Sequence, residues 1–252
     1  MEEKNKKENR TYSPVAVVGF ILALLVGGVE LLAGFGTQGG LWDYRRGISL
    51  LRWAAYGGIA VGLISLAGCF ATRPGAGRRG MVLAVGGFLI ALVVSGIPWS
   101  LQHQARQVPA IHDITTDPED PPRFTALLSL RKAMVNGAEY GGPGIVAKQS
   151  AAYPDIVPLE LSLPPAVAFK AALSATLSLG WQVIAADERA GRIEATATTF
   201  WFGFKDDVIV RVVPTARGSR IDIRSVSRVG KSDLGANARR IRAFLKAVRE
   251  TG

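Results

Sequence analysis

The residues best suited to binding an anion lie on two predicted strands in the last third of the chain. Strict alternation along the strand expected over 220–228 places Asp222, Arg224 and Arg228 on one face. Arg211 and Glu194, on the other strands of the predicted sheet, can join them. Opposite charges on adjacent strands attract each other, so this pattern favours a structural ladder of ion pairs. A basic surface that binds a partner is the alternative.

The turn after these strands carries Lys231 and Ser232, directly before a predicted helix. The first N–H groups of a helix are unpaired and partly positive, and they bind phosphate or carboxylate groups. The run from Gly230 to Ser232 resembles the end of a phosphate-binding loop, but Ser225 stands where that motif needs a glycine. Asp233 can supply the negative charge itself. The sequence therefore favours a capped helix, with an anion such as a lipid headgroup as the alternative.

A catalytic use of this region would combine Asp206 and Asp207 with Arg211 and Arg224, in an enzyme that acts on an envelope substrate. No Gly-x-Ser-x-Gly or His-Glu-x-x-His motif is present. Cys69 is the single cysteine and the chain has 2 histidines, which excludes a cysteine-based zinc site and a multi-histidine metal centre. We therefore lean away from an enzyme, and we predict no catalytic residue, metal or cofactor.

Glu30 is an ionisable residue inside a long apolar run. Such residues are functional by default, since a charge in the bilayer is costly. Glu30 nevertheless lies five residues before the run ends at Phe35. We expect its carboxylate to snorkel to the outer interface or to meet an arginine of the following loop. A small transport or assembly subunit that uses Glu30 and glycine-rich helices is the alternative function.

The chain contains three apolar runs, each about as long as a helix needs to cross a bilayer. They cover residues 15–35, 53–72 and 81–99, in a chain of 252 residues that is 48% hydrophobic and carries a formal net charge of +10. Lysine and arginine are concentrated in the tail, 1–14, and in the loop between the second and third runs. This bias predicts a cytoplasmic N-terminus in the plasma (inner) membrane, with the C-terminal domain in the periplasm or an equivalent extracytoplasmic space.

The remainder of the chain predicts a tether and an α+β domain. Residues 100–160 are rich in proline, glycine and aspartate, and we expect a tether and an irregular segment there. Residues 161–252 predict a helix, four antiparallel strands in a meander and a second helix, arranged in two layers. The expected helices cover 166–179 and about 233–249, and the expected strands cover 181–185, 193–198, 208–213 and 220–228.

Several segments of this domain resemble the family known as domain of unknown function 1499. The motifs that carry the resemblance are IHDITTD (111–117), PPRF (121–124), AYPDI (152–156), GFKDDV (203–208) and RSVSRVGKSDLG (224–235). The name of the family records that its activity is not established. The resemblance therefore implies a relationship and no particular chemistry.

We interpret the chain as an integral membrane protein with an extracytoplasmic module. A non-catalytic binding or assembly factor fits best, with the lipid bilayer as its environment and a protein or an anionic lipid as its partner. Nucleic acid is not an expected partner, because the basic residues are dispersed along the chain and the module is expected to face away from the cytoplasm.

Overall fold

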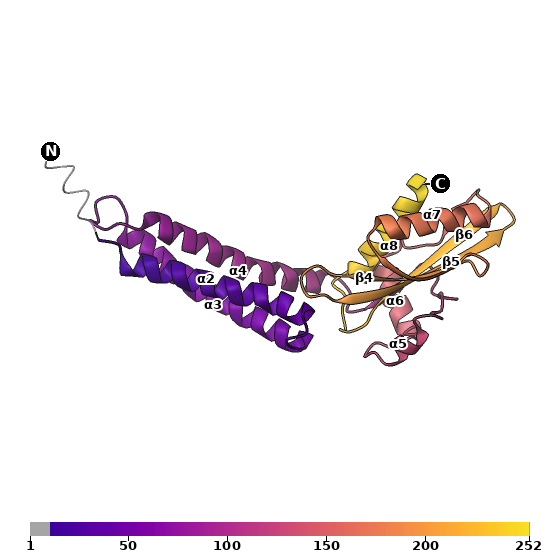
Figure 1. The fold of residues 1–252 in the computed structure, drawn as a ribbon, viewed down its shortest axis with the longest axis horizontal. Coiled ribbons are helices and arrows are strands. Elements are labelled where there is room, and N and C mark those ends of the chain that lie inside the picture. Colours follow the sequence, from indigo (N-terminus) through magenta and orange to yellow (C-terminus); the bar gives the residue numbers. More distant parts are fainter. Residues whose placement is uncertain (1–10, 252) are drawn as a thin grey trace. The chain divides into compact units, whose positions relative to one another are not determined.

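The computed structural model describes residues 11–251 and divides them into two compact units (Figure 1). One unit runs to His103 and includes Trp201–Gly203. The other contains Gln104–Phe200 and the chain from Phe204 onward. Most of the predicted basic tail, residues 1–10, lies outside the described residues.

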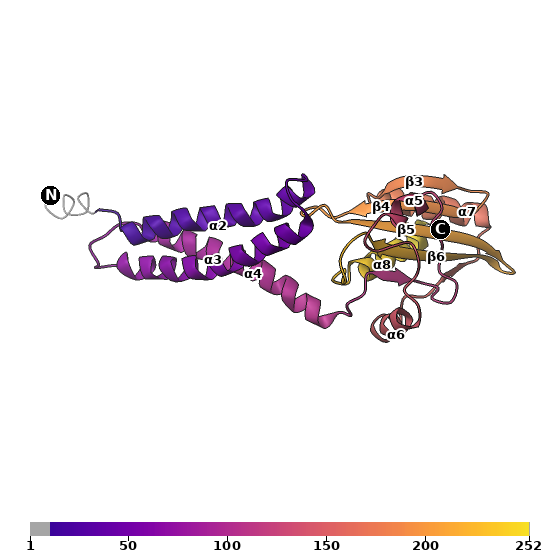
Figure 2. The same cartoon turned by 90° about the horizontal axis from the view of Figure 1, so that it is seen from below.

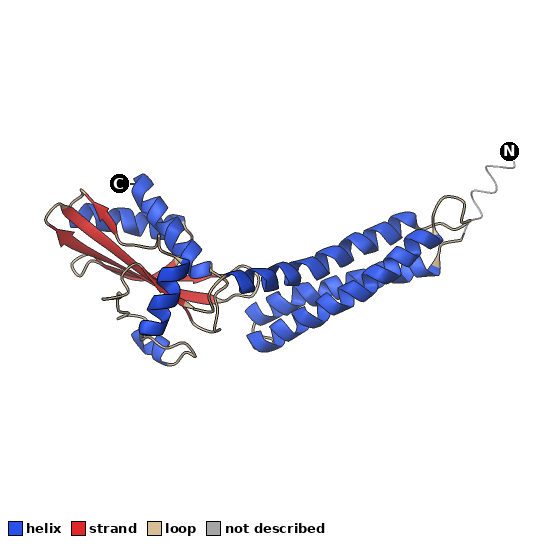
Figure 3. Cartoon of the chain, turned by 180° about the vertical axis from the view of Figure 1, so that it is seen from behind, coloured by secondary structure: helices blue, strands red, loops and turns tan. Residues whose placement is uncertain are grey.

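The first unit is built from three long helices (Figure 3). They are α2 (Pro14–Gln38), α3 (Tyr44–Ala71) and α4 (Met81–Gln107), with mean hydropathies of 2.6, 1.7 and 2.3 in their most apolar windows. All three are long and apolar enough to cross a membrane, which confirms the three predicted runs. The helices extend beyond those runs, and at the start of α3 the side chain of Asp43 accepts the N–H groups of Arg45 and Arg46, which lets that helix begin in polar sequence.

Small residues let these helices approach one another closely. A Cβ atom added at Gly19 would lie 2.9 Å from the Oγ of Ser65, and one added at Gly87 would lie 2.8 Å from the same oxygen. A Cβ atom at Gly58 would meet the Oγ of Ser95 at 2.6 Å. Close backbone approach through glycine and serine is typical of helices that associate in lipid. By contrast, Gly28 has no neighbour within 4 Å of an added Cβ, so not every predicted glycine lies at a contact.

The second unit is a six-stranded antiparallel sheet with helices, which confirms the α+β class. The main path of the sheet has the order β1-β6-β5-β4-β3, and β2 also pairs with β6. Figure 2 shows the strands β3 to β6 of this sheet. The strands are β1 (Asp113–Thr115), β2 (Leu159–Leu161), β3 (Gln182–Asp187), β4 (Arg192–Thr198), β5 (Lys205–Thr215) and β6 (Gly218–Ser227). The helices are α5 (Leu128–Lys132), α6 (Pro143–Ala152), α7 (Pro165–Ser178) and α8 (Ala236–Thr251).

One face of the sheet packs against α7 and α8, and we call it the helix face. Its strands contribute alternate apolar residues, among them Ile193, Val208 and Ile221, which form one core with Phe169 and Phe244 from the two helices. Because successive side chains of a strand point to opposite sides, the residues between them lie on the other face. In Figure 1 the segment that contains α5 lies on this other side.

The region predicted as a tether and irregular segment is more ordered than we expected. Residues 113–115 and 159–161 form β1 and β2, and both pair with β6, so the sheet has two more strands than the meander alone. Helix α6 forms within 136–154, where glycine and proline predict a loop. Each added strand has three residues, which is too short for a detectable alternation of polar and apolar residues.

Candidate functional site

The face of the sheet opposite the helix face carries a layer of paired charges. Its position follows from the alternation, since Glu194, Asp207, Arg211, Asp222 and Arg224 each stand next to apolar residues of the helix face. We define this arginine–carboxylate layer by its six arginines (131, 192, 211, 220, 224, 228) and its six carboxylates (Asp113, Asp117, Asp120, Glu194, Asp207, Asp222).

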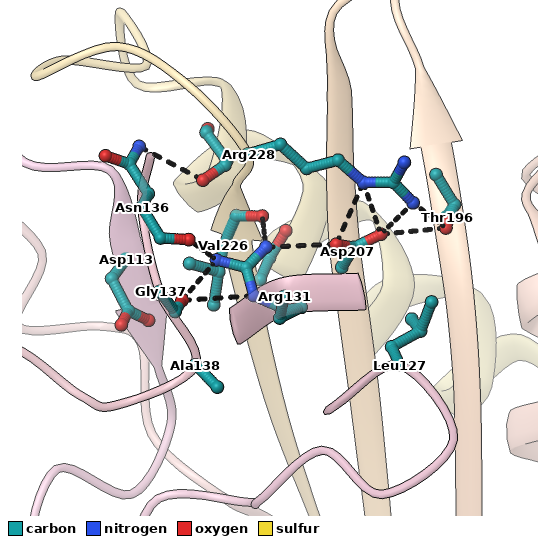
Figure 4. Close-up of polar contacts among 12 residues, drawn as sticks. Asp113, Leu127, Arg131, Asn136, Gly137, Ala138, Thr196, Asp207, Val226 and Arg228 are labelled. Atoms are coloured by element: carbon teal, nitrogen blue, oxygen red, sulfur yellow. Dashed lines mark hydrogen bonds and ion pairs between the residues drawn. The ribbon is translucent and has the colours of Figure 1, made fainter. Parts of the chain in front are cut away.

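The centre of the layer is Asp207, whose side chain is completely buried (Figure 4). Its carboxylate accepts hydrogen bonds from Arg131 Nη1 at 3.0 Å, from Arg228 Nη2 at 2.8 Å and from the hydroxyl of Thr196 at 2.8 Å. The Arg131 side chain is also completely buried. The three strong hydrogen bonds to this carboxylate compensate for the cost of removing the charges of Asp207 and Arg131 from water.

All five N–H groups of Arg131 have acceptors. Apart from Asp207, these are the backbone carbonyls of Asn136, Gly137 and Val226, at 2.7 to 3.2 Å. Burial lowers the pKa of Arg131, and the hydrogen bond and charge of Asp207 act in the opposite direction. Arg131 therefore holds the loop after α5 against strand β6.

A second buried pair joins Arg224 to Asp113. Arg224 donates from Nε at 2.9 Å and from Nη2 at 2.7 Å to the two carboxylate oxygens, a bidentate geometry that is specific to arginine. The ring of Phe124 lies 5.6 Å from this guanidinium and 5.3 Å from that of Arg131. Tyr140 also lies 5.5 Å from Arg224, and burial followed by the charge of Asp113 raises the pKa of Tyr140 to about 12.

The third part of the layer lies nearer its edge. Arg211 donates to Asp222, Asp117 and Asp120 at 3.0, 3.1 and 2.7 Å. Arg220 donates to Asp117 at 2.6 Å and to Asp222 at 3.0 Å. Two of these carboxylates, Asp117 and Asp120, belong to the acidic stretch before α5, and they bind arginines of the protein itself.

Glu194 fixes the segment that covers the layer. Its completely buried carboxylate accepts the backbone N–H groups of Thr125, Ala126 and Leu127 at 2.8, 3.0 and 2.8 Å. These N–H groups precede α5, where they have no helical partner. The side chain of Leu127 then packs with Ile209 in a small apolar cluster between the segment and the sheet.

The structure places Arg211, Arg224 and Arg228 on one face of the sheet, as the alternation predicted. Each of the three is paired with carboxylates of the same chain, which agrees with a structural ladder. It does not bring together the residues of the catalytic hypothesis. Asp206 and Asp207 are neighbours on β5 and point to opposite faces, and Asp206 pairs with Arg240 of α8 at 2.6 Å.

The predicted anion site at the start of α8 is occupied by the protein's own side chains. Asp233 accepts the N–H groups of Gly235 and Asn237, both at 2.8 Å, and the Ser232 hydroxyl accepts that of Leu234 at 3.3 Å. Burial raises the pKa of Asp233, although these N–H groups favour its charged form. Lys231 is exposed and makes no ion pair with any described residue.

Glu30 is placed differently from the expectation. Its side chain is buried, with only 4% of the residue exposed, and its Oε1 atom has no hydrogen-bond partner among the described residues. It lies on the same helix face as Ala23, Ala33 and Gly34, which are also buried. Among the described residues Glu30 forms no ion pair, so the expected contact with an arginine of the following loop is not made.

Arg131 was not among the predicted residues of the layer. Asp113 and Glu194 were considered without their partners, because those partners lie far away in the sequence. Among residues 11–251, no group of three or more histidine, cysteine, aspartate or glutamate side chains is placed to hold a metal ion.

The residues of the arginine–carboxylate layer fall within one region that matches a known protein family. The profile of a protein family of unknown function, DUF1499, matches residues 113–248. The chain belongs to the DUF1499 family. The matched region begins at the first residue of β1 and ends in α8, so it contains the whole arginine–carboxylate layer, with the three candidate membrane-spanning helices before it. No curated protein matches the chain significantly.

Proposed function

We propose that this DUF1499 protein is a non-catalytic module held at a membrane, and that its outer surface binds anionic lipid. The observation that carries the proposal is the internal pairing of the arginine–carboxylate layer. Six arginines and six carboxylates satisfy one another there, so the layer holds its covering segment on the sheet and presents no unpaired reactive group of its own. This supports a structural role for the layer and a binding role for the exterior.

The exterior of the module carries the excess positive charge. Residues 100–252 contain 20 lysines and arginines against 15 aspartates and glutamates. Since the layer contains equal numbers of both, the excess lies outside it. Basic residues near a membrane attract anionic headgroups, with about 1 kcal/mol for each lysine or arginine close to the surface.

Two exposed lysines identify the part of the exterior that we expect to bind. Lys205 begins β5, and Lys231 lies in the turn after β6, so both are at the same end of the antiparallel sheet. The backbone confirms their proximity to this end, since Arg228 N donates to Lys205 O at 3.0 Å. Arg189 and Arg217 lie in the turns at the opposite end, and they offer a control with the same change in charge.

Native mass spectrometry of the full chain tests the proposal. The protein is released from micelles containing equal amounts of phosphatidylglycerol and phosphatidylcholine, and the retained lipids are counted. We expect the wild type and Arg189→Gln/Arg217→Gln to retain phosphatidylglycerol preferentially, and Lys205→Gln/Lys231→Gln to lose part of this preference. Equal retention of the two lipids by the wild type would overturn the proposal. If crosslinking in native membranes then recovered one protein consistently, a protein partner would replace the lipid.

Orientation belongs to the same proposal. The distribution of lysine and arginine supports an N-terminus in the cytoplasm and a module outside it, in the plasma membrane. A cysteine introduced at Arg217, in a Cys69→Ser background, should react with a membrane-impermeant maleimide in intact cells. Reaction only after the membrane is opened would reverse the orientation.

A second candidate function is favoured by Glu30. A buried carboxylate oxygen without a partner, in a helix that can span a membrane, is typical of groups that carry a proton or a cation. In proteoliposomes with an internal pH dye, we expect faster proton entry with the wild type than with Glu30→Gln. Equal rates would remove this candidate and leave Glu30 as a packing residue.

A further inference from the structure

We propose that Phe200, in the loop between β4 and β5, inserts its ring into the interfacial region of the lipid bilayer. The loop, residues 199–204, has the sequence Thr-Phe-Trp-Phe-Gly-Phe, with four aromatic residues in six positions. Phe200 is 84% exposed. Aromatic rings, tryptophan above all, are enriched at the level of the lipid headgroups, where one part of the ring is in apolar surroundings and another is wet.

The loop is closed tightly, so its side chains are presented by a defined hairpin. Thr199 N donates to Phe204 O at 2.9 Å, and Phe204 N donates to the Thr199 hydroxyl at 2.9 Å. The rings of Trp201 and Phe202 meet edge to face, with their centroids 5.0 Å apart. Gly203 has a φ of +64°, which a residue with a side chain rarely adopts and which the turn requires.

The register of the sheet places this loop at the end where the chain enters the module. His112 O accepts the N–H of Ser227, and Ser227 pairs with Asp206 at the beginning of β5. The first residue of β1 and the aromatic loop are therefore at one end of the sheet. Lys205 and Lys231 are at this end too, so basic side chains flank the aromatic ones, as an anionic headgroup layer requires.

The covalent connection keeps this end of the module near a bilayer. Helix α4 continues from Trp99, the last residue of its apolar run, to Gln107, which adds roughly 12 Å of helix. Residues 108–112 then span at most about 18 Å when fully extended. The first residue of β1, at the same end of the sheet as the aromatic loop, is therefore at most about 30 Å of chain from Trp99.

The inference rests on the proposed function, since it names the element with which the module contacts lipid, but its test uses uncharged lipid so that the two can fail separately. In a Cys69→Ser background, Phe200→Cys is labelled with the fluorophore NBD, and three other aromatic residues remain in the loop. Arg217→Cys, in the turn at the opposite end of β5, is the matched control. The full chain is placed in phosphatidylcholine nanodiscs, with and without brominated acyl chains.

We expect a blue-shifted emission at position 200, with strong quenching by brominated lipid and weak quenching by iodide, and the reverse at position 217. Equal iodide quenching at both positions would show that the loop is in water, and would overturn the inference. Protection of position 200 from both quenchers would show that protein covers the loop, which overturns it as well. Lipid quenching at 200 without a preference for phosphatidylglycerol would refute charge-dependent binding and leave the inserted loop in place.

Discussion

Replacing Asp207 with asparagine tests whether paired charge holds the layer together. The substitution keeps the size of the side chain but removes its charge. Arg131 would then be a fully buried guanidinium without a carboxylate, while Arg228, with 16% of its side chain exposed, could still reach water. Removing one partner of a buried ion pair costs about 3–5 kcal/mol, because the other charge is left uncompensated.

The chain contains a matched control for this experiment. Arg242 and Asp155 form a bidentate pair at 2.6 and 2.7 Å, and their side chains are 42% and 54% exposed. Exposed pairs contribute roughly 0.2–1 kcal/mol, since water solvates both charges when the pair is broken. Asp155→Asn makes the same chemical change in an exposed pair, in which a single arginine holds the carboxylate and water can solvate the charge that is left.

Hydrogen exchange of the full chain in detergent measures the two costs within the module. Peptides from β5 and β6 report the free energy of opening of the sheet, separately from the helices of the first unit. We expect Asp207→Asn to accelerate their exchange by two to nearly four powers of ten, and Asp155→Asn by less than about tenfold. Equal acceleration in the two variants would refute the reasoning that burial of the charge determines its contribution.

Three further predictions concern separate parts of the structure. Burial raises the pKa of Asp233 in the folded protein, so the stability that this carboxyl group contributes is fully present below its unfolded pKa and is lost as the pH rises through its folded pKa. In Asp233→Asn the free energy of unfolding should therefore fall less over this pH window, and identical pH profiles of the two proteins would contradict the prediction. Gly87→Ile should lower the melting temperature of the helical unit, because the new side chain would overpack against Ser65 at a cost of about 1–3 kcal/mol in stability. Gly28→Ile should leave the melting temperature unchanged, and equal effects of the two substitutions would refute the packing argument. Glu194→Gln turns an NH₂ group toward the backbone N–H donors of residues 125–127, at a cost of about 1–3 kcal/mol. Trypsin should therefore cut the segment 116–142 faster than in the wild type, and an unchanged rate of cleavage would argue that Glu194 does not hold this segment.

The helices and the longer strands could be predicted because their signals are local. A run of about 20 apolar residues is sufficient to indicate each membrane-spanning candidate, whatever lies around it. Strand β4 was predicted from the alternation of Ile193, Ala195 and Ala197 with polar residues, and α7 from its apolar face and the glycine that ends it. Strands β1 and β2 gave no such signal, because they exist only as short pairs with β6.

The candidate site was predictable in part. Alternation correctly placed Arg211, Arg224 and Arg228 on one face, since neighbouring strands of a meander are close in sequence. The partners were beyond reach, because Arg224 and Asp113 are separated by 111 positions and Arg131 and Asp207 by 76. Nothing in the spacing of the residues along the chain records which distant loop folds over the sheet.

The sequence by itself determined the division of this protein into apolar helices and an α+β module, because hydrophobic length and periodicity act over a few turns or one strand. Only the tertiary structure decided that the arginines bind carboxylates of the same chain and that Glu30 is buried. These outcomes depend on contacts between segments far apart in sequence, where the cost of burying each charge is balanced by a partner that no local pattern specifies.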